Sequence, residues 1–347
     1  MKKSCVKLLL FFCLFVYLFS MFLVVSCGQE KNFFSQGLKF TISEDGRYYL
    51  VSLGDCKDEN VIIPSTYDFL PVKAIKEQGF YNCKSIKKVE MPSSIEIIEP
   101  LAFSGCENLA EVSFSNGLKN IENNAFSSCL SLKSLVLPET VETIGYLAFS
   151  GCIRIEQLSL PKTLRKIGAY AFSSCGALKS VFISENVTEI GYATFKDCQS
   201  LINISVDKDN ENYISLEGNL YSKDKKVLYQ YALGKPESEY IIPQTTITIF
   251  DYACYNSNLT KVIFPDCLTK IGFSAFEGSE TLRSVEFGSE ISHIGNRAFY
   301  LCSNLTEILF YGTSQEWRTK EFGKDNFIGC VATTVKCVDA EINLQAD

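Results

Sequence analysis

Histidine and tryptophan are almost absent from this sequence, which has one residue of each among its 347. The sequence also has no P-loop, no G-x-S-x-G and no C-x-x-C spacing. These patterns respectively bind phosphate, carry a nucleophilic serine and hold a metal ion. Carboxylate pairs occur, but none of them stands out from ordinary solvated acids. The sequence therefore predicts a protein that is not an enzyme and that uses neither a cofactor nor a metal ion.

Basic clusters are missing as well. The 33 lysine and arginine residues are outnumbered by 40 aspartate and glutamate residues, which gives a net charge of −7. Lys2, Lys3 and Lys7 lie at the start of the chain, and without them 30 basic residues oppose the same 40 acidic ones, a net charge of −10. An acidic surface is repelled by a nucleic acid backbone. A nucleic acid partner is therefore not expected.

Repetition is what the sequence has in abundance. Phenylalanine recurs every 23 residues, and a cysteine stands three residues after each of these phenylalanines. The phenylalanines are Phe80, Phe103, Phe126, Phe149, Phe172 and Phe195, and the cysteines are Cys83, Cys106, Cys129, Cys152, Cys175 and Cys198. The register returns after a gap at Cys254, and then at Phe276, Phe299 and Cys302. A unit of this length cannot bury its own apolar face, so its copies are expected to stack into a solenoid with a continuous core.

The apolar skeleton of the unit predicts its strands. The unit reads approximately A-F-x-x-C-x-x-L-x-x-L-x-L-P-x-x-L-x-x-I-G-x-x. Its L-x-L portion alternates as a strand does, and the following proline lacks the N–H group that would extend the strand. The Ile-Gly step predicts a tight turn. Glu99 and Glu122 replace the glycine in two units, so a positive φ is not required at that position.

The unit resembles the BspA-like class of leucine-rich repeats, known from surface proteins of bacteria and of some parasites. The Ala-Phe pair, the phased cysteine, the L-x-L-Pro segment and the Ile-Gly step have the spacing of that family over about residues 60–311. The asparagine of commoner leucine-rich repeats is kept as Asn186 but is replaced by Thr140 and Thr163. The resemblance implies a β-rich leucine-rich-repeat solenoid of about nine to ten 23-residue repeats, with a parallel strand sheet on one face. It also implies a surface-exposed interaction protein, often an adhesin.

The 15 cysteines are expected to be mostly structural. A cysteine that recurs in phase is a small residue suited to a core, and parallel side chains along a stack rarely reach disulfide geometry. We therefore expect the phased cysteines to be buried free thiols. Cys330 and Cys337, near the C-terminal end, could form a disulfide or remain free.

The start of the chain predicts where the protein goes. Three lysines precede a long apolar run, which ends in Val24-Val25-Ser26-Cys27-Gly28. Small residues before a single cysteine resemble a bacterial lipobox, in which the peptide is cut before the cysteine and the thiol receives a diacylglycerol. Cys27 is therefore the expected lipid attachment site of a protein of the bacterial cell envelope or cell surface. An uncleaved membrane helix and an ordinary signal peptide are the alternatives.

Breaks in the repeat predict the organisation of the chain. Apolar runs flank Glu44-Asp45-Gly46 and again flank the polar stretch around Asp224, and both patterns indicate β-hairpins. The first hairpin is expected to cap the open end of the solenoid. The predicted segments are a lipoprotein signal peptide at 1–26, a tether at 27–36, a capping hairpin with a partial repeat at 37–75, the solenoid at 76–311 with a hairpin insert at 207–240, and a degenerate closing repeat at 312–347.

Two weaker signals have ordinary explanations. His293 lies at a variable position of the repeat, where Thr143 and Lys166 stand in other units, so it is expected at the surface. The acidic stretch at 207–212 has some likeness to a calcium-binding loop. It lacks the glycine and the final glutamate that such a loop requires, and a polar loop is favoured.

One row of residues predicts a binding surface. In each strand the residue between the last two apolar positions is expected to point outward, which gives Glu90, Ser113, Val136, Ser159, Phe182, Ser205, Ile263, Glu286 and Leu309. Exposed apolar residues grouped on one face indicate a partner site, and an aromatic side chain is a suitable anchor. The candidate partner-binding residues are Val136, Phe182, Ile263, Leu309, Glu90 and Glu286. The alternative is that the insert or a terminal segment covers this row.

These signals together predict a non-catalytic, lipid-anchored module on the cell surface. Its expected partners are proteins of the extracellular matrix or of a cell surface, bound by the sheet face, together with the membrane through the lipid anchor. The alternative is a carbohydrate-binding envelope protein or a structural surface antigen. The lone tryptophan counts against carbohydrate binding, because sugar sites favour several exposed aromatic rings.

Overall fold

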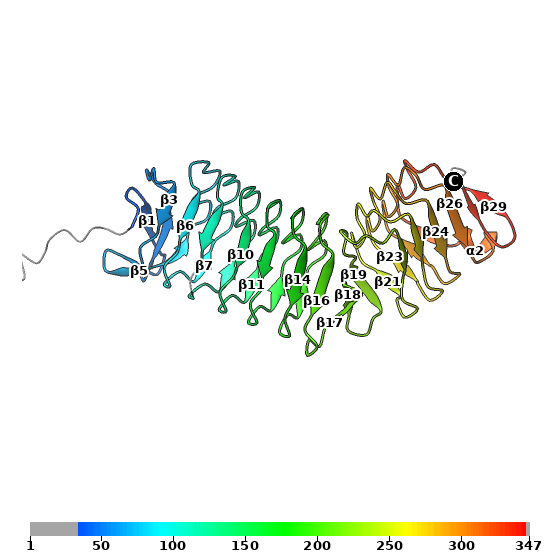
Figure 1. Cartoon of the computed structure of the whole chain (residues 1–347), viewed down its shortest axis with the longest axis horizontal. Helices are drawn as coiled ribbons and strands as arrows, with labels where there is room; N and C mark the ends of the chain where they lie inside the picture. Colours follow the sequence, from blue (N-terminus) through cyan, green and yellow to red (C-terminus); the bar gives the residue numbers. More distant parts are fainter. Residues whose placement is uncertain (1–33, 115, 345–347) are drawn as a thin grey trace, which may run out of the picture.

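The protein is a β-solenoid with about 12 turns of parallel strands. The computed structural model describes residues 34–114 and 116–344. Figure 1 shows an elongated stack of coils that changes direction near β17 and β19. The predicted number of repeats covers the coils that keep the 23-residue spacing, and the two ends and the insert supply the remaining turns.

The first ladder of strands contains the L-x-L segments. The second residue of each three-residue core is the inward one, as in β10, where Leu135 is buried between exposed Ser134 and Val136. The strands stop before the prolines, so Pro138 and Pro161 lie just beyond β10 and β12 as predicted. The strands are β3 (Asn60–Ile62), β6 (Lys88–Glu90), β8 (Glu111–Ser113), β10 (Ser134–Val136), β12 (Gln157–Ser159), β14 (Ser180–Ile183), β16 (Asn203–Val206), β20 (Glu239–Ile241), β22 (Lys261–Ile263), β24 (Ser284–Phe287), β26 (Glu307–Phe310) and β28 (Thr334–Lys336).

A second parallel ladder runs along the other side of each coil, where only a turn was predicted. In five of the coils the strand ends at the isoleucine of an Ile-Gly step, and the turn follows the glycine. Most of these strands have two residues, too few for an alternating pattern to reveal them. They are β5 (Leu70–Ile75), β7 (Ile97–Ile98), β9 (Asn120–Ile121), β11 (Thr143–Ile144), β13 (Lys166–Ile167), β15 (Glu189–Ile190), β19 (Val227–Gln230), β21 (Thr248–Ile249), β23 (Lys270–Ile271), β25 (His293–Ile294) and β27 (Glu321–Phe322).

The phased phenylalanines and cysteines form the spine of the core. The rings of Phe126 and Phe149 stack with their centroids 5.2 Å apart and their planes within 2°. All of the phased cysteines are buried free thiols, as predicted. Cys330 and Cys337 are also free. The core buries the methyl and ring surface that a single 23-residue unit would leave in water.

Cys254, where the sequence indicated that the register returns, lies outside the cysteine ladder. It occupies the position of the phased phenylalanine, because its N–H donates to the carbonyl of Ala275 as Phe276 donates to Ala298. Three residues later, Ser257 stands where the ladder has a cysteine, and it contacts Ser279 of the next coil through their hydroxyl groups at 2.9 Å.

Both ends of the stack carry additional elements. At the N-terminal end β1 (Lys39–Ile42) pairs with β2 (Tyr49–Ser52) as an antiparallel hairpin, and β4 (Thr66–Tyr67) pairs with the start of β5 as a second one. At the C-terminal end, β29 (Glu341–Asn343) pairs with β28. The short helix α2 (Ser314–Arg318) begins with a Thr313 capping box and buries Trp317, the arrangement in which two N-terminal N–H groups are satisfied.

The insert is an antiparallel meander built into the solenoid. β17 (Tyr213–Leu216) pairs with β18 (Asn219–Ser222), and β18 pairs with β19. The predicted hairpin around Asp224 is the β18–β19 turn. Because β19 then pairs in parallel with β21, the insert re-enters the second ladder and the repeat resumes after it.

No helix among residues 34–114 and 116–344 combines the length and the hydrophobicity needed to cross a membrane. The predicted signal peptide and Cys27 lie outside the described residues.

Candidate interaction face

The outward side of the first ladder has two parallel rows of side chains. One row is formed by the first residue of each strand and the other by the third residue, and the strand registers align them wherever neighbouring strands pair. The insert separates β16 from β20, so the rows have a part before the insert and a part after it. Every member of the first-residue row is polar or charged: Asn60, Lys88, Glu111, Ser134, Gln157, Ser180, Asn203, Glu239, Lys261, Ser284, Glu307 and Thr334. The third-residue row is the one that the sequence predicted to face outward.

The third-residue row has exposed apolar side chains at two of the predicted positions. Val136 is 65% exposed and Phe182 is 46% exposed. Ile263 and Leu309 lie on the same row but are half-buried. The structure thus leaves two of the four predicted apolar residues, Val136 and Phe182, open to solvent before the insert, and it aligns the other two in one sheet after the insert.

Sequence reasoning missed two members of this row. Ile241 in β20 aligns with Ile263 and is 64% exposed, and Ile62 in β3 aligns with Glu90 and is 39% exposed. Both belong to an Ile-Ile-Pro segment, and this segment could have identified them as members of the row. They were overlooked because the insert and the N-terminal cap interrupt the 23-residue count. The row therefore has apolar residues at Ile62, Val136, Phe182, Ile241, Ile263 and Leu309.

The two predicted acidic members of the row are already paired. Glu90 and Glu111 both contact the Lys88 ammonium at 3.0 Å. Glu286 lies 2.5 Å from the Lys261 ammonium and accepts a hydrogen bond from the Tyr311 hydroxyl at 2.6 Å. These contacts hold the pKa of Glu286 below its usual value, the Lys261 hydrogen bond being the largest cause. The two glutamates flank the apolar residues as neutralised pairs.

The insert does not cover Val136 or Phe182 on the third-residue row. The insert packs beside β16, where the Ile204 N–H donates to Gly218 and the Ser215 hydroxyl donates to Ile204, at 2.8 and 2.6 Å. Val136 and Phe182 remain exposed. Within the described part of the chain, the alternative of a covered row therefore does not hold at these two positions.

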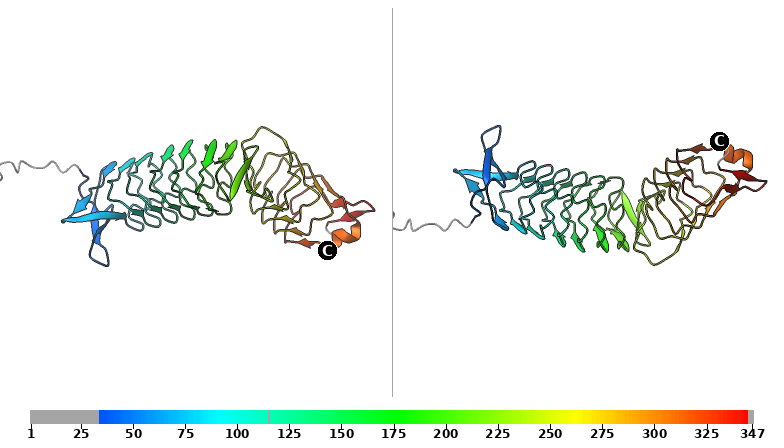
Figure 2. Two further views of the ribbon diagram at one scale, coloured as in Figure 1. Left: turned by 90° about the horizontal axis from the view of Figure 1, so that it is seen from below. Right: turned by 90° about the horizontal axis from the view of Figure 1, so that it is seen from above.

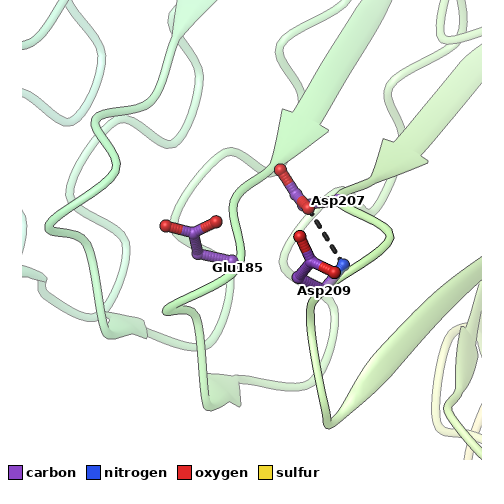
Figure 3. Close-up of side chains that lie close together, drawn as sticks. All are labelled: Glu185, Asp207 and Asp209. Atoms are coloured by element: carbon purple, nitrogen blue, oxygen red, sulfur yellow. Dashed lines mark hydrogen bonds between the residues drawn. The ribbon is translucent and has the colours of Figure 1, made fainter.

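The acidic stretch at the start of the insert gathers three carboxylates. Ligand oxygens of Glu185, Asp207 and Asp209 all lie within 4.8 Å of one another, and Figure 3 shows that they come from adjacent coils. Asp207 is engaged by the Asp209 N–H at 3.0 Å, and Lys208 lies 3.8 Å from Asp209. The cluster has the local contacts of a polar turn.

The single histidine and the single tryptophan both contact neighbouring side chains of the fold. His293 lies on β25 with 40% of its side chain exposed, and its Nδ1 atom is 3.5 Å from Glu321. Trp317 is buried against Phe310 and Phe322, so it offers no face to a sugar. Beside it, residues of the closing unit line a cavity of about 700 Å³.

An aromatic cluster joins the coils on either side of the insert. Tyr170 lies 5.7 Å from Tyr252 across the insert, and the Lys196 ammonium stands 3.8 Å above the Tyr255 ring. Burial lowers the pKa of Lys196. Asn256 donates to Asp197 at 3.0 Å, over 59 residues of sequence. These contacts tie together coils that the insert separates along the chain.

Comparison with known proteins agrees with this architecture. The sequence model described as BspA type Leucine rich repeat region matches residues 73–202 and 229–343 in 6 copies. The pneumococcal vaccine antigen PcpA is similar, with a TM-score of 0.77, 25% identity, and coverage of 87% of this chain and 80% of that one. A leucine rich cell surface protein from Faecalibacterium prausnitzii A2-165 gives a TM-score of 0.65 and 22% identity over 82% of this chain and 96% of its own. No match was found among curated proteins.

Proposed function

Because this chain belongs to the BspA-type leucine-rich repeat family, we propose that it is a lipid-anchored surface module that binds a protein partner through the face of its first ladder. The module holds the partner and performs no bond chemistry. Its partner is a protein of the extracellular matrix or of a cell surface.

The observation that carries this proposal is the contrast between the two rows. The first-residue row is polar in every coil, whereas Val136, Phe182 and Ile241 stand exposed on the third-residue row. Water would favour polar side chains equally on both rows if the face were only structural. Exposed apolar side chains grouped in this way are typical of protein interaction sites, and the ring of Phe182 offers the largest single area to bury.

Two similarities support a surface role. PcpA is described as a vaccine antigen, and the Faecalibacterium protein as a cell surface protein. The lipobox resemblance ending at Cys27 supports the same location.

The test of the face is a double substitution, Val136→Ser with Phe182→Ser. Each side chain is exposed and makes little contribution to the core, so the protein should fold normally and lose at least about tenfold in affinity for matrix or cell-surface proteins, as expected for a hot spot. Binding is measured by surface plasmon resonance against a matrix and cell-surface protein panel, beside a glycan array that tests the carbohydrate alternative.

A matched control exists away from the two rows. Ile153 is 48% exposed and Val338 is 65% exposed, so Ile153→Ser with Val338→Ser removes a comparable apolar surface. This control should retain binding. If the double substitution on the row and the control bind equally well, the face is not the site.

The anchor is tested separately at Cys27. Mass spectrometry of the mature protein should find a diacylglycerol on Cys27 as the first residue, and Cys27→Ala should leave the precursor uncleaved. Detergent partitioning provides the second readout, because the parent should enter the detergent phase. A mature N-terminus at any other residue, or an unmodified Cys27, would contradict the anchor.

A further inference from the structure

We propose that the β4–β5 hairpin at the N-terminal end of the solenoid contacts the lipid bilayer, with Phe69 at its tip entering the interface. This inference rests on the proposed lipid anchor. Figure 2 shows the hairpin extending beyond the end of the stack, away from the other coils.

The side chain of Phe69 packs against no other part of the described protein. Its side chain is 100% exposed, whereas the other phenylalanines with large exposure, Phe182 and Phe322, reach only 46% and 39%. A fully exposed phenylalanine ring can be removed from water at the boundary between water and lipid, where surface-bound segments bury Trp, Phe and Leu side chains.

The turn that presents Phe69 is also unusual. Asp68 and Phe69 are the two connecting residues between Tyr67 and Leu70, and both have positive φ, 45° and 63°. A two-residue hairpin of this kind favours asparagine and glycine, although bulky residues also take positive φ inside the coils, as Leu101 and Tyr252 do. Glycine would satisfy the backbone and a polar residue would suit water, so neither requirement explains a phenylalanine here.

The strand residue next to the tip of the hairpin is held by aromatic packing. Tyr67 stacks on Phe40 with a centroid distance of 4.0 Å and an angle of 11° between the planes, and Tyr49 packs edge-on against Tyr67 at 5.1 Å. Ile42, 45% exposed, adds apolar surface at the end of β1. The projecting tip is therefore carried on a rigid support, as an interfacial wedge requires.

The point where the chain enters the fold places this end next to the membrane. The Ser35 N–H donates to Ile62 at 2.9 Å, so the chain is fixed beside β3, only a few residues before the hairpin. Between Cys27 and Phe34 there are seven peptide steps, which span at most about 25 Å when fully extended. A lipid on Cys27 thus keeps the first coil close to the bilayer surface.

The net charge of the N-terminal end does not favour binding to anionic lipid headgroups. Between residues 34 and 75, four basic residues (Lys39, Arg47, Lys57 and Lys73) face six acidic ones (Glu44, Asp45, Asp55, Asp58, Glu59 and Asp68). Anionic lipid would not attract this end. The occupant is therefore the apolar boundary of a bilayer, and the contact should persist at high salt.

The experiment places a tryptophan at the tip. The full-length acylated protein carrying Phe69→Trp is reconstituted into phosphatidylcholine vesicles with brominated acyl chains, which quench only tryptophans in contact with them. Val338→Trp at the C-terminal end is the matched control, and the buried Trp317 of the parent gives the background. We expect the emission of Trp at 69 to fall at least about twofold and to shift to the blue, and the control to be unchanged.

The anchor and the hairpin contact can fail independently. Mass spectrometry of Cys27 reports on the anchor. If Cys27 is unmodified, residues 28–347 are held on the same vesicles by an N-terminal hexahistidine tag and nickel-chelating lipid, and quenching at position 69 is measured there. Vesicle-bound protein without quenching at 69 overturns the inference. So does a dimer in analytical ultracentrifugation that Phe69→Ser abolishes, since the occupant of the tip would then be a second copy.

Discussion

At the scale of single residues, the ladder cysteines are hydrogen-bond donors as well as core residues. The Cys106 thiol donates to the carbonyl of Phe80 at 3.0 Å, and Cys198 donates to that of Phe172 at 3.1 Å. Burial raises the pKa of both thiols to about 12. They therefore remain protonated at neutral pH and keep the S–H donor. Ser279, which stands in a cysteine position, likewise donates to Cys254 at 3.2 Å.

The raised pKa of these thiols predicts a loss of stability in alkali. An unfolded thiol has a pKa of about 8.5, so between about pH 8.5 and the folded-state pKa the unfolded chain releases a proton that the folded protein keeps. The free energy of unfolding should be unaffected below this window and should fall within it by up to about 1.4 kcal/mol per pH unit for each thiol.

This dependence can be measured by denaturant unfolding at about pH 8, 9.5 and 10.5. Cys198→Ser replaces the thiol with a group that does not ionise in this range, so its stability should decline less steeply than that of the parent. Equal slopes for the two proteins would mean that Cys198 titrates normally. Tyrosines also titrate in this range, and the comparison with the parent cancels their contribution.

At the scale of one coil, Gly168 of the Ile-Gly step lies against the backbone of the neighbouring coil, although other coils accommodate a glutamate at this position, at Glu99 and Glu122. A Cβ atom on Gly168 would lie 2.5 Å from the carbonyl carbon of Gly145 and 2.6 Å from the backbone nitrogen of Tyr146. Gly168 has no positive φ, so its requirement is close approach and not an unusual backbone angle. The sequence predicted correctly that positive φ is not needed at this step.

Gly168→Ala should therefore force neighbouring coils apart and destabilise the protein by about 1–3 kcal/mol, the usual cost of overpacking. Gly176→Ala is the control, because a Cβ atom there meets nothing within 4 Å and φ is not positive. The control should be neutral or slightly stabilising. Chemical denaturation of both variants decides the matter, and equal stabilities would show that the coils can relax around the added methyl group.

The elements that keep the period could be predicted from the sequence, and those that interrupt it could not. The L-x-L strands, the strand ends before Pro138 and Pro161, and the buried cysteine ladder follow from local pattern. Ile241 was missed because the insert shifts the count. The exact place of Cys254 needed the structure, because cysteine and phenylalanine both suit a core and only hydrogen bonds distinguish the two positions. The contact of Tyr170 with Tyr252 has no local signal at all.

At the scale of the whole molecule, the solenoid contains two core clusters. The first extends from Val51 to Leu220 and the second from Tyr221 to Ile342, and they meet within β18, where Figure 1 shows the change of direction. A solenoid is stabilised coil by coil through nearest neighbours, so the joint between the clusters decides whether the two halves unfold together. On one edge the joint consists of the tyrosine cluster that spans the insert.

Tyr252 is the residue at this joint whose removal should separate the halves. Its ring contacts Tyr170 at 5.7 Å and Phe273 at 5.3 Å, and the Lys196 ammonium stands 5.2 Å from its centroid.

Trp317 belongs to the second cluster, so tryptophan fluorescence reports that half alone, while far-UV circular dichroism reports both. In the parent we expect the two signals to change at the same denaturant concentration. In Tyr252→Ser they should diverge, because the weakened joint no longer couples the halves, and Tyr146→Ser, which loses one contact with Tyr170 at 6.0 Å, should still show coincident transitions. Coincident transitions in folded Tyr252→Ser would place the coupling in the β18 meander, where the Tyr221 and Tyr240 hydroxyls meet.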